Sequence, residues 1–287
     1  MPAVLRDVEL TRAWTLAADR KSLVGPKQGP KVDVAIGDWH SGRFWIEPVA
    51  GAWQVADATT WRGALFTGTR RISRQRRVLE DLGPQPIPIE DGDILVLSRA
   101  AVVLFRLETE DIAPPTLEPV AAARSLLDAA RVTMDLGLAE PAARLARRLG
   151  ECREPEFLAS LVESARAAVL EPGGIPARRV GAVSVLGEAG RFLPEAVRPL
   201  RSALSDPDRE VRIVAVRALA RIGGSHVVDA LLAALEDADD GIFLTALGAI
   251  ERAREASYRP ALLELRGRTV TPKRKDHLRR VLEDLES

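Results

Sequence analysis

The chain has 287 residues, of which 46% are hydrophobic and 29% charged, and its 41 Lys and Arg residues balance its 41 Asp and Glu residues. This length and composition predict a folded protein of about two domains, and the zero net charge excludes a global field that would attract nucleic acid or an anionic membrane. The single cysteine, Cys152, excludes an intramolecular disulfide and fits a reducing compartment.

The sequence shows no signal for a membrane. No apolar run approaches the ~18 residues that a spanning helix needs. The first residues, MPAVLRDVELTRAW, carry charges throughout and lack the apolar segment of a signal peptide. We therefore expect a cytoplasmic protein without membrane insertion. Abundant arginine and alanine with little lysine is typical of a GC-rich bacterial genome.

Residues 12–107 contain short alternating runs separated by Gly, Pro and Asp. Such runs predict strands of a β-sandwich or barrel. The expected strands are 12–17, 31–36, 43–49, 52–57, 63–68, 87–89, 93–98 and 101–108. With about eight to ten strands in all, we expect two packed sheets.

Four stretches of this region resemble the forkhead-associated (FHA) domain. They are KSLVGP (21–26), HSGRF (40–44), AWQVADATTWRGALFTG (52–68) and IPIEDGDILVLS (87–98). Residues 57–68 follow the family pattern D-L-x-S-x-N-G-T-x-x-N-G without a gap, with Gly63 and Gly68 in register. The resemblance implies an FHA-like β-sandwich, a fold that typically binds phosphothreonine peptides through loops at one end.

The family's recognition residues are largely replaced. Pro26 stands for the phosphate-binding arginine, Phe44 for the histidine and Arg62 for the asparagine. Gly25 and Ser41 keep the family residue, and Thr60 keeps a hydroxyl. An arginine–phosphate contact is charge-assisted and strong, so its loss predicts a degenerate interaction domain that does not depend on phosphate.

An alternative is a rewired cationic site. Basic side chains elsewhere in these loops could bind an anion, and Arg62 could meet a phosphate or carboxylate from the opposite side. The candidate anion-binding residues are Ser41, Arg43, Thr60, Arg62, Lys27 and Lys31.

An arginine-rich insertion lies between two expected strands, at residues 70–86. Its basic side chains are Arg70, Arg71, Arg74, Arg76 and Arg77. Such a cluster suits an acidic protein or nucleic acid. Since no aromatic residues are interleaved for base stacking, we favour protein contact or simple solvation over nucleic-acid binding. In the case of simple solvation, the insertion would be a short solvated helix with residues 78–82 packing back.

Composition changes near residue 110. All five tryptophans lie in the first 61 residues, and alanine, leucine and arginine dominate after about residue 120. The acidic and proline-rich stretch ETEDIAPPTLEP (108–119) lies between the two regions. Consecutive prolines favour an extended connection. We predict a β-sandwich domain at 1–110, a linker at 111–119 and a helical domain at 120–287.

The helical domain contains an internal repeat. Residues 178–190 align with 211–224 at an offset of 33, and two further shifts of 31 continue the pattern. Apolar residues recur at three- and four-residue steps, which predicts pairs of amphipathic helices that bury their apolar faces by stacking. Residues 175–287 resemble HEAT repeats, especially the bacterial variety related to phycobilisome-lyase repeats. With earlier helices at 121–151 and 155–172, we expect an α-solenoid of about four or five pairs.

Several charged residues of the repeat have two interpretations. Arg179 and Arg212 occupy the repeat's usual arginine position, and we expect them to pair with inter-repeat carboxylates such as Asp206. The segment 271–280, with Lys273, Arg274 and Lys275, is either a patch for nucleic acid or an acidic partner, or the solvated face of a capping helix. His226 and His277 lack metal-ligand spacing.

No phosphate-cradling glycine loop, metal-ligand cluster or nucleophile elbow occurs in the sequence. We therefore predict a protein that is not an enzyme and needs no cofactor or metal, and that serves as an adaptor or scaffold for protein partners, including phosphorylated or acidic ones. The alternatives are a phosphothreonine-peptide reader with the rewired site, and a nucleic-acid-binding protein that uses segments 70–77 and 271–280.

Overall fold

The computed structural model describes residues 3–7, 13–25, 32–35, 43–58, 70–72, 79–82, 84–90, 93–98, 101–107, 119–152, 154–268 and 271–285. The chain divides into two compact units, Met1–Phe157 and Leu158–Ser287. Most of the predicted linker 111–119 lies outside the described residues, so the boundaries 1–110 and 120–287 remain predictions.

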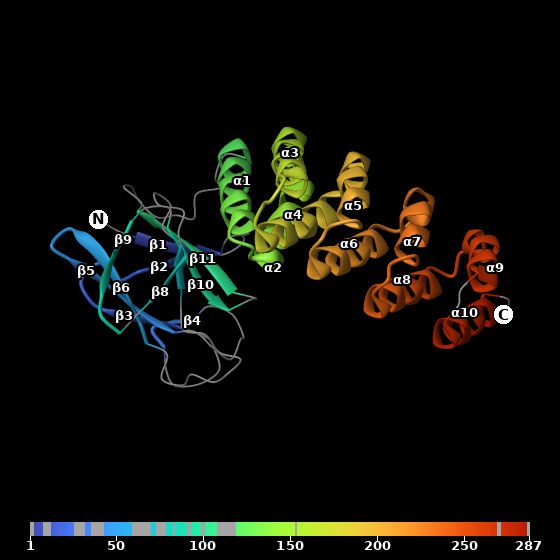
Figure 1. Ribbon diagram of the computed structural model, residues 1–287. Coiled ribbons are helices and arrows are strands. Elements are labelled where there is room, and N and C mark those ends of the chain that lie inside the picture. The colour runs from blue at the N-terminus through green and yellow to red at the C-terminus, as the bar shows by residue number, and fades with distance from the viewer. Residues whose placement is uncertain are drawn as a thin grey trace. The chain divides into compact units, whose positions relative to one another are not determined.

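The first unit contains two sheets within its described residues (Figure 1). One has six strands in the order β2 (Ala13–Thr15), β1 (Ala3–Asp7), β11 (Ala101–Leu107), β10 (Ile94–Ser98), β7 (Arg70–Ile72) and β8 (Leu79–Asp81). The other has five, in the order β4 (Val34–Ala35), β3 (Ser22–Gly25), β5 (Phe44–Val49), β6 (Ala52–Asp57) and β9 (Ile87–Ile89).

Side chains from both sheets share one buried cluster. In β5, Phe44 and Ile46 are fully buried while Trp45 between them is partly exposed, because alternate residues of a strand point to opposite faces. The buried members of the cluster are Ala3, Leu5, Leu16, Val24, Phe44, Ile46, Trp53, Val55, Leu82, Ile89 and Leu95. The two sheets are therefore held by a common apolar core.

The register of β5 and β6 is set by a two-residue turn. Val49 pairs with Ala52, and the residues between them, Ala50 and Gly51, have φ angles of 48° and 86°. Positive φ at both central positions matches the right-handed twist of the strands. This turn places Phe44 opposite Asp57 at the far end of the hairpin.

Most of the predicted strands are confirmed. The expected strand at 63–68 lies outside the described residues. β1 and β3 were not expected, because their segments AVLRD and SLVG show no clear alternation. In the arginine-rich insertion, the described residues 70–72 and 79–81 form β7 and β8, which pair antiparallel with Arg70 opposite Asp81 and Arg71 opposite Glu80, and not the helix considered for them. Residues 73–78 lie outside the described residues.

The helices form consecutive pairs, as predicted. In the first unit, α1 (Pro119–Asp135) packs against α2 (Ala139–Glu151). α3 (Pro155–Leu170) leads into the second unit. The helices that follow are α4 (Pro176–Ala189), α5 (Val197–Ala203), α6 (Arg209–Ile222), α7 (Val228–Ala234), α8 (Asp240–Ala253), α9 (Arg259–Arg268) and α10 (Pro272–Asp284).

The even-numbered helices of the second unit form a continuous row, because α4 packs against α6, α6 against α8 and α8 against α10 (Figure 1). The short helices α5 and α7 pack against the members of this row next to them in the chain. Fully buried apolar residues of the row include Leu186, Val216 and Ile250. Neighbouring pairs thus bury one another's apolar faces, which gives a solenoid-like unit.

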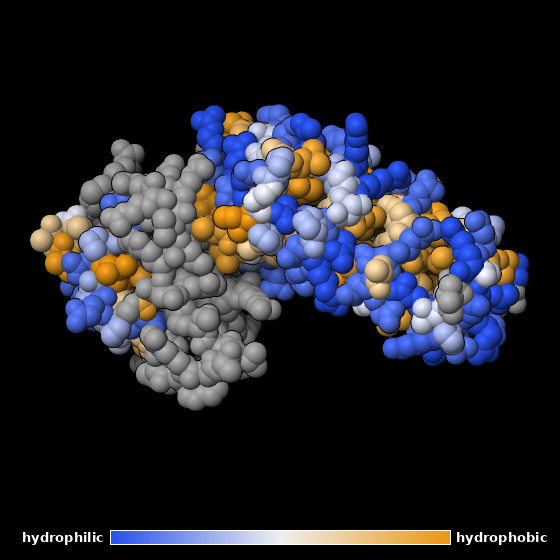
Figure 2. Space-filling model, viewed as in Figure 1, coloured by the Kyte–Doolittle hydropathy of each residue, from blue (hydrophilic) through white to orange (hydrophobic). Residues whose placement is uncertain are grey.

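The surface of the second unit is mainly hydrophilic in the view of Figure 2, with small apolar patches scattered over it. Among its described residues, the exposed large apolar ones are Leu170, Ile175, Phe192, Leu244 and Leu263. None of the described helices is long and apolar enough to cross a membrane.

Ile175 occupies the N-cap position of α4 and is 66% exposed. The aligned residues Asp208 and Asp239 cap α6 and α8 with the same extended backbone. Because an aspartate there would accept otherwise unsatisfied N–H groups of α4, Ile175→Asp is expected to raise the free energy of unfolding by about 1 kcal/mol. Urea unfolding would measure the change, with Ile175→Ala as the control that adds no cap. Equal stability of the two variants would contradict the prediction.

Candidate functional site

Most of the predicted N-terminal site residues lie outside the part of the chain that the structure describes. Those outside the described residues are Lys27, Lys31, Ser41, Thr60, Arg62, Arg74, Arg76 and Arg77. Arg43 directly precedes β5, and its side chain lies across Gly25, since a Cβ at Gly25 would be 2.9 Å from Arg43 Cγ. A glycine at position 25 therefore gives the stem of Arg43 room at the end of β3. Arg70 and Arg71 lie in β7.

Two arginines of the second unit join consecutive helix pairs. Arg179 of α4 places Nε 2.7 Å from Asp206 Oδ2 and Nη2 3.0 Å from Asp206 Oδ1. Arg212 of α6 repeats the arrangement, because its Nε donates to Asp237 Oδ2 at 2.8 Å and its Nη1 to Asp206 O at 2.9 Å. The predicted pairing of Arg179 and Arg212 with inter-repeat carboxylates is confirmed. We call the pairs Arg179–Asp206 and Arg212–Asp237 the two rungs.

Each rung carboxylate begins an Asp-x-Asp turn. Asp206 Oδ1 accepts a hydrogen bond from the backbone N–H of Asp208, and Asp237 Oδ1 accepts one from that of Asp239, both at 2.8 Å. The second aspartate of each turn caps the next helix by accepting two N–H groups of its first turn. One short turn thus fixes both the position of a helix and its link to the preceding pair.

Asp239 accepts a further hydrogen bond, from Arg209 Nε at 2.6 Å. This bond, helped by the cap N–H groups and opposed by desolvation, lowers the pKa of Asp239 to about 2. Since the folded-state pKa lies below the unfolded value, the ionised carboxylate stabilises the fold above pH ~4, and that contribution is lost as pH falls towards 2.

Replacing Arg209 with glutamine is expected to raise the pKa of Asp239 towards the ordinary aspartate value of ~3.9. The acid-unfolding midpoint should rise with it, because the carboxylate then takes up its proton at a higher pH. NMR titration of the Asp239 carboxyl would measure the pKa. Arg217→Gln serves as the control, since Arg217 is exposed on the same helix and has no ion pair within the described part of the chain. An unchanged pKa in Arg209→Gln would contradict this account.

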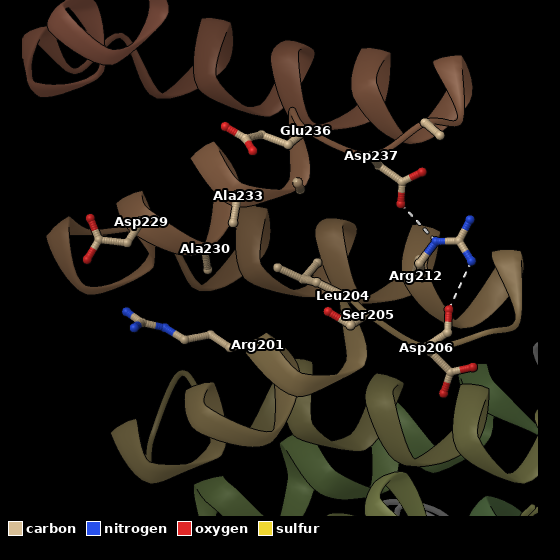
Figure 3. A pocket seen from close by; sticks show the side chains of 12 residues that line it. Arg201, Leu204, Ser205, Asp206, Arg212, Asp229, Ala230, Ala233, Glu236 and Asp237 are labelled. Carbon is tan, nitrogen blue, oxygen red and sulfur yellow. Dashed lines mark hydrogen bonds and ion pairs between the residues drawn. The ribbon is translucent and has the colours of Figure 1, made fainter. Parts of the chain in front are cut away.

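A groove of about 600 Å³ lies between α5 and α7 and the turns that follow them (Figure 3). It is lined by Arg201, Leu204, Ser205, Asp206, Arg212, Asp229, Ala230, Ala233, Ala234, Glu236, Asp237 and Ala238. The groove stays open because α7 contributes mainly alanines to it. Rung residues reach one end of the groove, and Arg201 and Asp229 lie away from them (Figure 3).

The charges of the groove are of both signs. Arg201 Nη2 donates to His226 O at 2.7 Å, and Arg212 is held by its rung. Asp229 is exposed and has no ion pair within the described residues. Apolar alanines next to exposed charges suit a polypeptide segment of a partner.

The basic segment 271–280 is divided by the structure. Lys273 and Lys275 are exposed on α10, whereas Arg274 is largely covered. Arg274 Nε lies 2.7 Å from Asp240 Oδ1, and its guanidinium is 4.6 Å from the ring of Phe243. Arg274 therefore contacts α8, whereas Lys273, Lys275, Arg279 and Arg280 of the segment are exposed.

The described residues contain no group of His, Cys, Asp and Glu that could hold a metal ion. The Cys152 thiol donates to Arg148 O at 3.2 Å, and burial raises its pKa. A raised pKa keeps a thiol protonated and poorly nucleophilic.

Sequence reasoning missed the groove residues Arg201, Asp229 and Glu236, as well as the Arg209–Asp239 pair. Only their positions in the repeat could have indicated these residues, because each lies within a few residues of the aligned Asp-x-Asp turns or at the start of a repeat helix. Single-residue motifs do not mark such positions, because they become neighbours only when two helix pairs stack.

Residues 166–251 match the family model of HEAT repeats. No curated protein matches the chain. The chain is similar to two crystal structures of engineered proteins, one with a TM-score of 0.36 and 17% identity over 60% of this chain and 93% of the other, the second with 0.32 and 19% over 58% and 54%. Both rungs lie inside the matched residues, so the second unit contains HEAT-like repeats.

Proposed function

We propose that the chain is a non-enzymatic adaptor or scaffold that binds protein partners. The match of residues 166–251 to HEAT repeats carries the proposal. Stacked helix pairs present an extended surface, which repeat proteins use for binding. The groove between α5 and α7 supports it, because it combines alanines with exposed charges. The single cysteine and the composition fit a bacterial cytoplasm.

We further propose that the N-terminal 110 residues form an FHA-like β-sandwich that no longer depends on phosphothreonine, joined by the linker 111–119 to the helical domain. Two sheets around a shared core support the sandwich. The pattern at 57–68 supports the family, and Pro26 and Arg62 support the loss of phosphate recognition.

Fluorescence anisotropy with phosphorylated and unphosphorylated threonine peptides tests the second proposal. The full-length chain is expected to bind both peptides equally or neither. Selective binding of the phosphopeptide that is lost in Arg62→Ala would overturn it in favour of a rewired reader.

Affinity capture tests the scaffold proposal itself. Immobilised full-length chain and the segment 120–287 are each incubated with a lysate of the native cells. Both are expected to retain the same specific proteins, and recovery of background proteins alone from both would contradict the proposal. A gel shift at low ionic strength separates it from nucleic-acid binding, which would appear as salt-dependent association.

A further inference from the structure

The last helix pair, α9–α10, is attached differently from the pairs before it. Arg212 and Asp237 of the second rung correspond, 31 residues later, to Phe243 and Arg268. Phenylalanine cannot form an ion pair, and the acceptor position now carries a cation. Between the pair α7–α8 and the pair α9–α10, therefore, neither residue of a rung is present.

Two arginines of the last pair reach back instead. Arg268 Nη2 lies 2.6 Å from Glu236 Oε1. Arg274 Nε lies 2.7 Å from Asp240 Oδ1, and its two remaining guanidinium nitrogens donate to backbone carbonyls of the same turn at 2.9 and 3.0 Å. The cations thus come from the last pair and their acceptors from the turn 236–240, the reverse of a rung.

The turn 236–240, EDADD, forms ion pairs both with α6 and with the last helix pair. Its acidic side chains each hold one arginine: Asp237 holds Arg212 and Asp239 holds Arg209, both from α6, whereas Glu236 holds Arg268 and Asp240 holds Arg274. The last pair is therefore attached to the array through this acidic turn. The ion pairs that hold the turn to α6 do not involve the last pair.

The attachment of the last pair is also more exposed than a rung. The Arg179–Asp206 side chains are 8% and 6% exposed, whereas those of Arg268 and Glu236 are both 57% exposed. In the second contact of the last pair Arg274 is 15% exposed, and its acceptor Asp240 is 54% exposed. Exposed ion pairs are weak and are screened by salt, unlike buried ones. Apolar burial falls in the same direction, from five buried apolar residues in α4 (Ala182, Val183, Val185, Leu186 and Ala189) to three in α10 and one in α9.

We propose that α9–α10 is a cap that opens from α8 as a unit, with a stability set by its ionic contacts to the turn 236–240. Such local opening needs less free energy than global unfolding. It uncovers Phe243, which is 1% exposed and lies under Arg274 while the cap is closed. Added salt therefore shifts the cap towards the open state while the rungs keep α4, α6 and α8 together.

Hydrogen exchange of the full-length chain, followed by mass spectrometry at about 50 and about 500 mM NaCl, tests this proposal. Amides of 259–284 are expected to exchange about tenfold faster at high salt, with those of α4 and α6 unchanged. The double variant Arg268→Gln/Arg274→Gln should exchange faster at low salt and lose the response to salt.

Arg266→Gln is the matched control, because Arg266 is exposed on α9 and has no ion pair within the described residues. It should leave both exchange and salt response as in the wild type. Exchange of 259–284 that does not depend on salt would overturn the proposal, as would an equal effect of Arg266→Gln. Loss of protection in α4 and α6 together with the cap in the double variant would also overturn it.

Discussion

Arg179→Ala is expected to lower the free energy of unfolding of the helical unit by about 3 to 5 kcal/mol. The substitution leaves the carboxylate of Asp206, 6% exposed, without its bidentate partner. It also removes the hydrogen bond from Arg179 to Gly174 O. A buried charge without a partner costs more than an ion pair contributes, so the loss exceeds that of a surface contact. Urea unfolding followed by circular dichroism at 222 nm measures the change.

The neighbouring residue Arg178 provides the control. Its ion pair with Glu171 is partly exposed, at 32% and 47%, and exposed pairs typically contribute about 1 kcal/mol or less. Arg178→Ala should therefore cost a small fraction of what Arg179→Ala costs. Similar losses from the two substitutions would show that the rung is not a principal link between the helix pairs.

Gly187→Ala is expected to lower the free energy of unfolding by about 1 to 3 kcal/mol. A Cβ at position 187 would lie 2.7 Å from Ala218 Cβ and 3.2 Å from Ala218 Cα. Since the Ala218 atoms are held by the backbone of α6, they cannot turn aside, and α4 and α6 would have to separate. This strain outweighs the gain of about 1 kcal/mol that alanine normally brings over glycine in a helix.

Gly248→Ala makes the same change where there is space. The nearest atom to a Cβ at Gly248 is Arg252 Nη1, at 3.7 Å. This variant is expected to be more stable than the wild type, by up to about 1 kcal/mol. The two glycine variants should thus shift the urea midpoint in opposite directions, and a shift in the same direction would contradict the close packing of α4 on α6.

The internal repeat made the helical unit predictable from the sequence. Offsets of 33 and 31 aligned Arg179 with Arg212, and the expected pairing with Asp206 is confirmed because the carboxylate recurs in the same turn of the repeat. Arg274 occupies the same aligned position but was grouped with its basic neighbours. Arg274 contacts Asp240, whereas the aligned position of the preceding pair carries Phe243 in place of an arginine. Counting the charges of the segment 271–280 does not reveal this difference.

The β region was predictable where strands alternate and less so elsewhere. β5 and β6 follow a regular period, and their runs were placed to within a residue. β7 and β8 are three residues each, and the basic residues of the insertion suggested a solvated helix. These two strands pair antiparallel, and runs of three residues are too short to show the alternation that predicts a strand.

Capture by groove variants of the full-length chain tests the scaffold proposal most directly. Ala233 lines the groove between α5 and α7, whereas Ala253 is exposed at the end of α8 and does not line it. Ala233→Trp fills the groove, and Ala253→Trp adds the same bulk elsewhere. The account predicts that the wild type and Ala253→Trp retain the same specific proteins and that Ala233→Trp loses them with its fold intact. Background proteins alone on the wild-type chain, or the same proteins on all three chains, would contradict it.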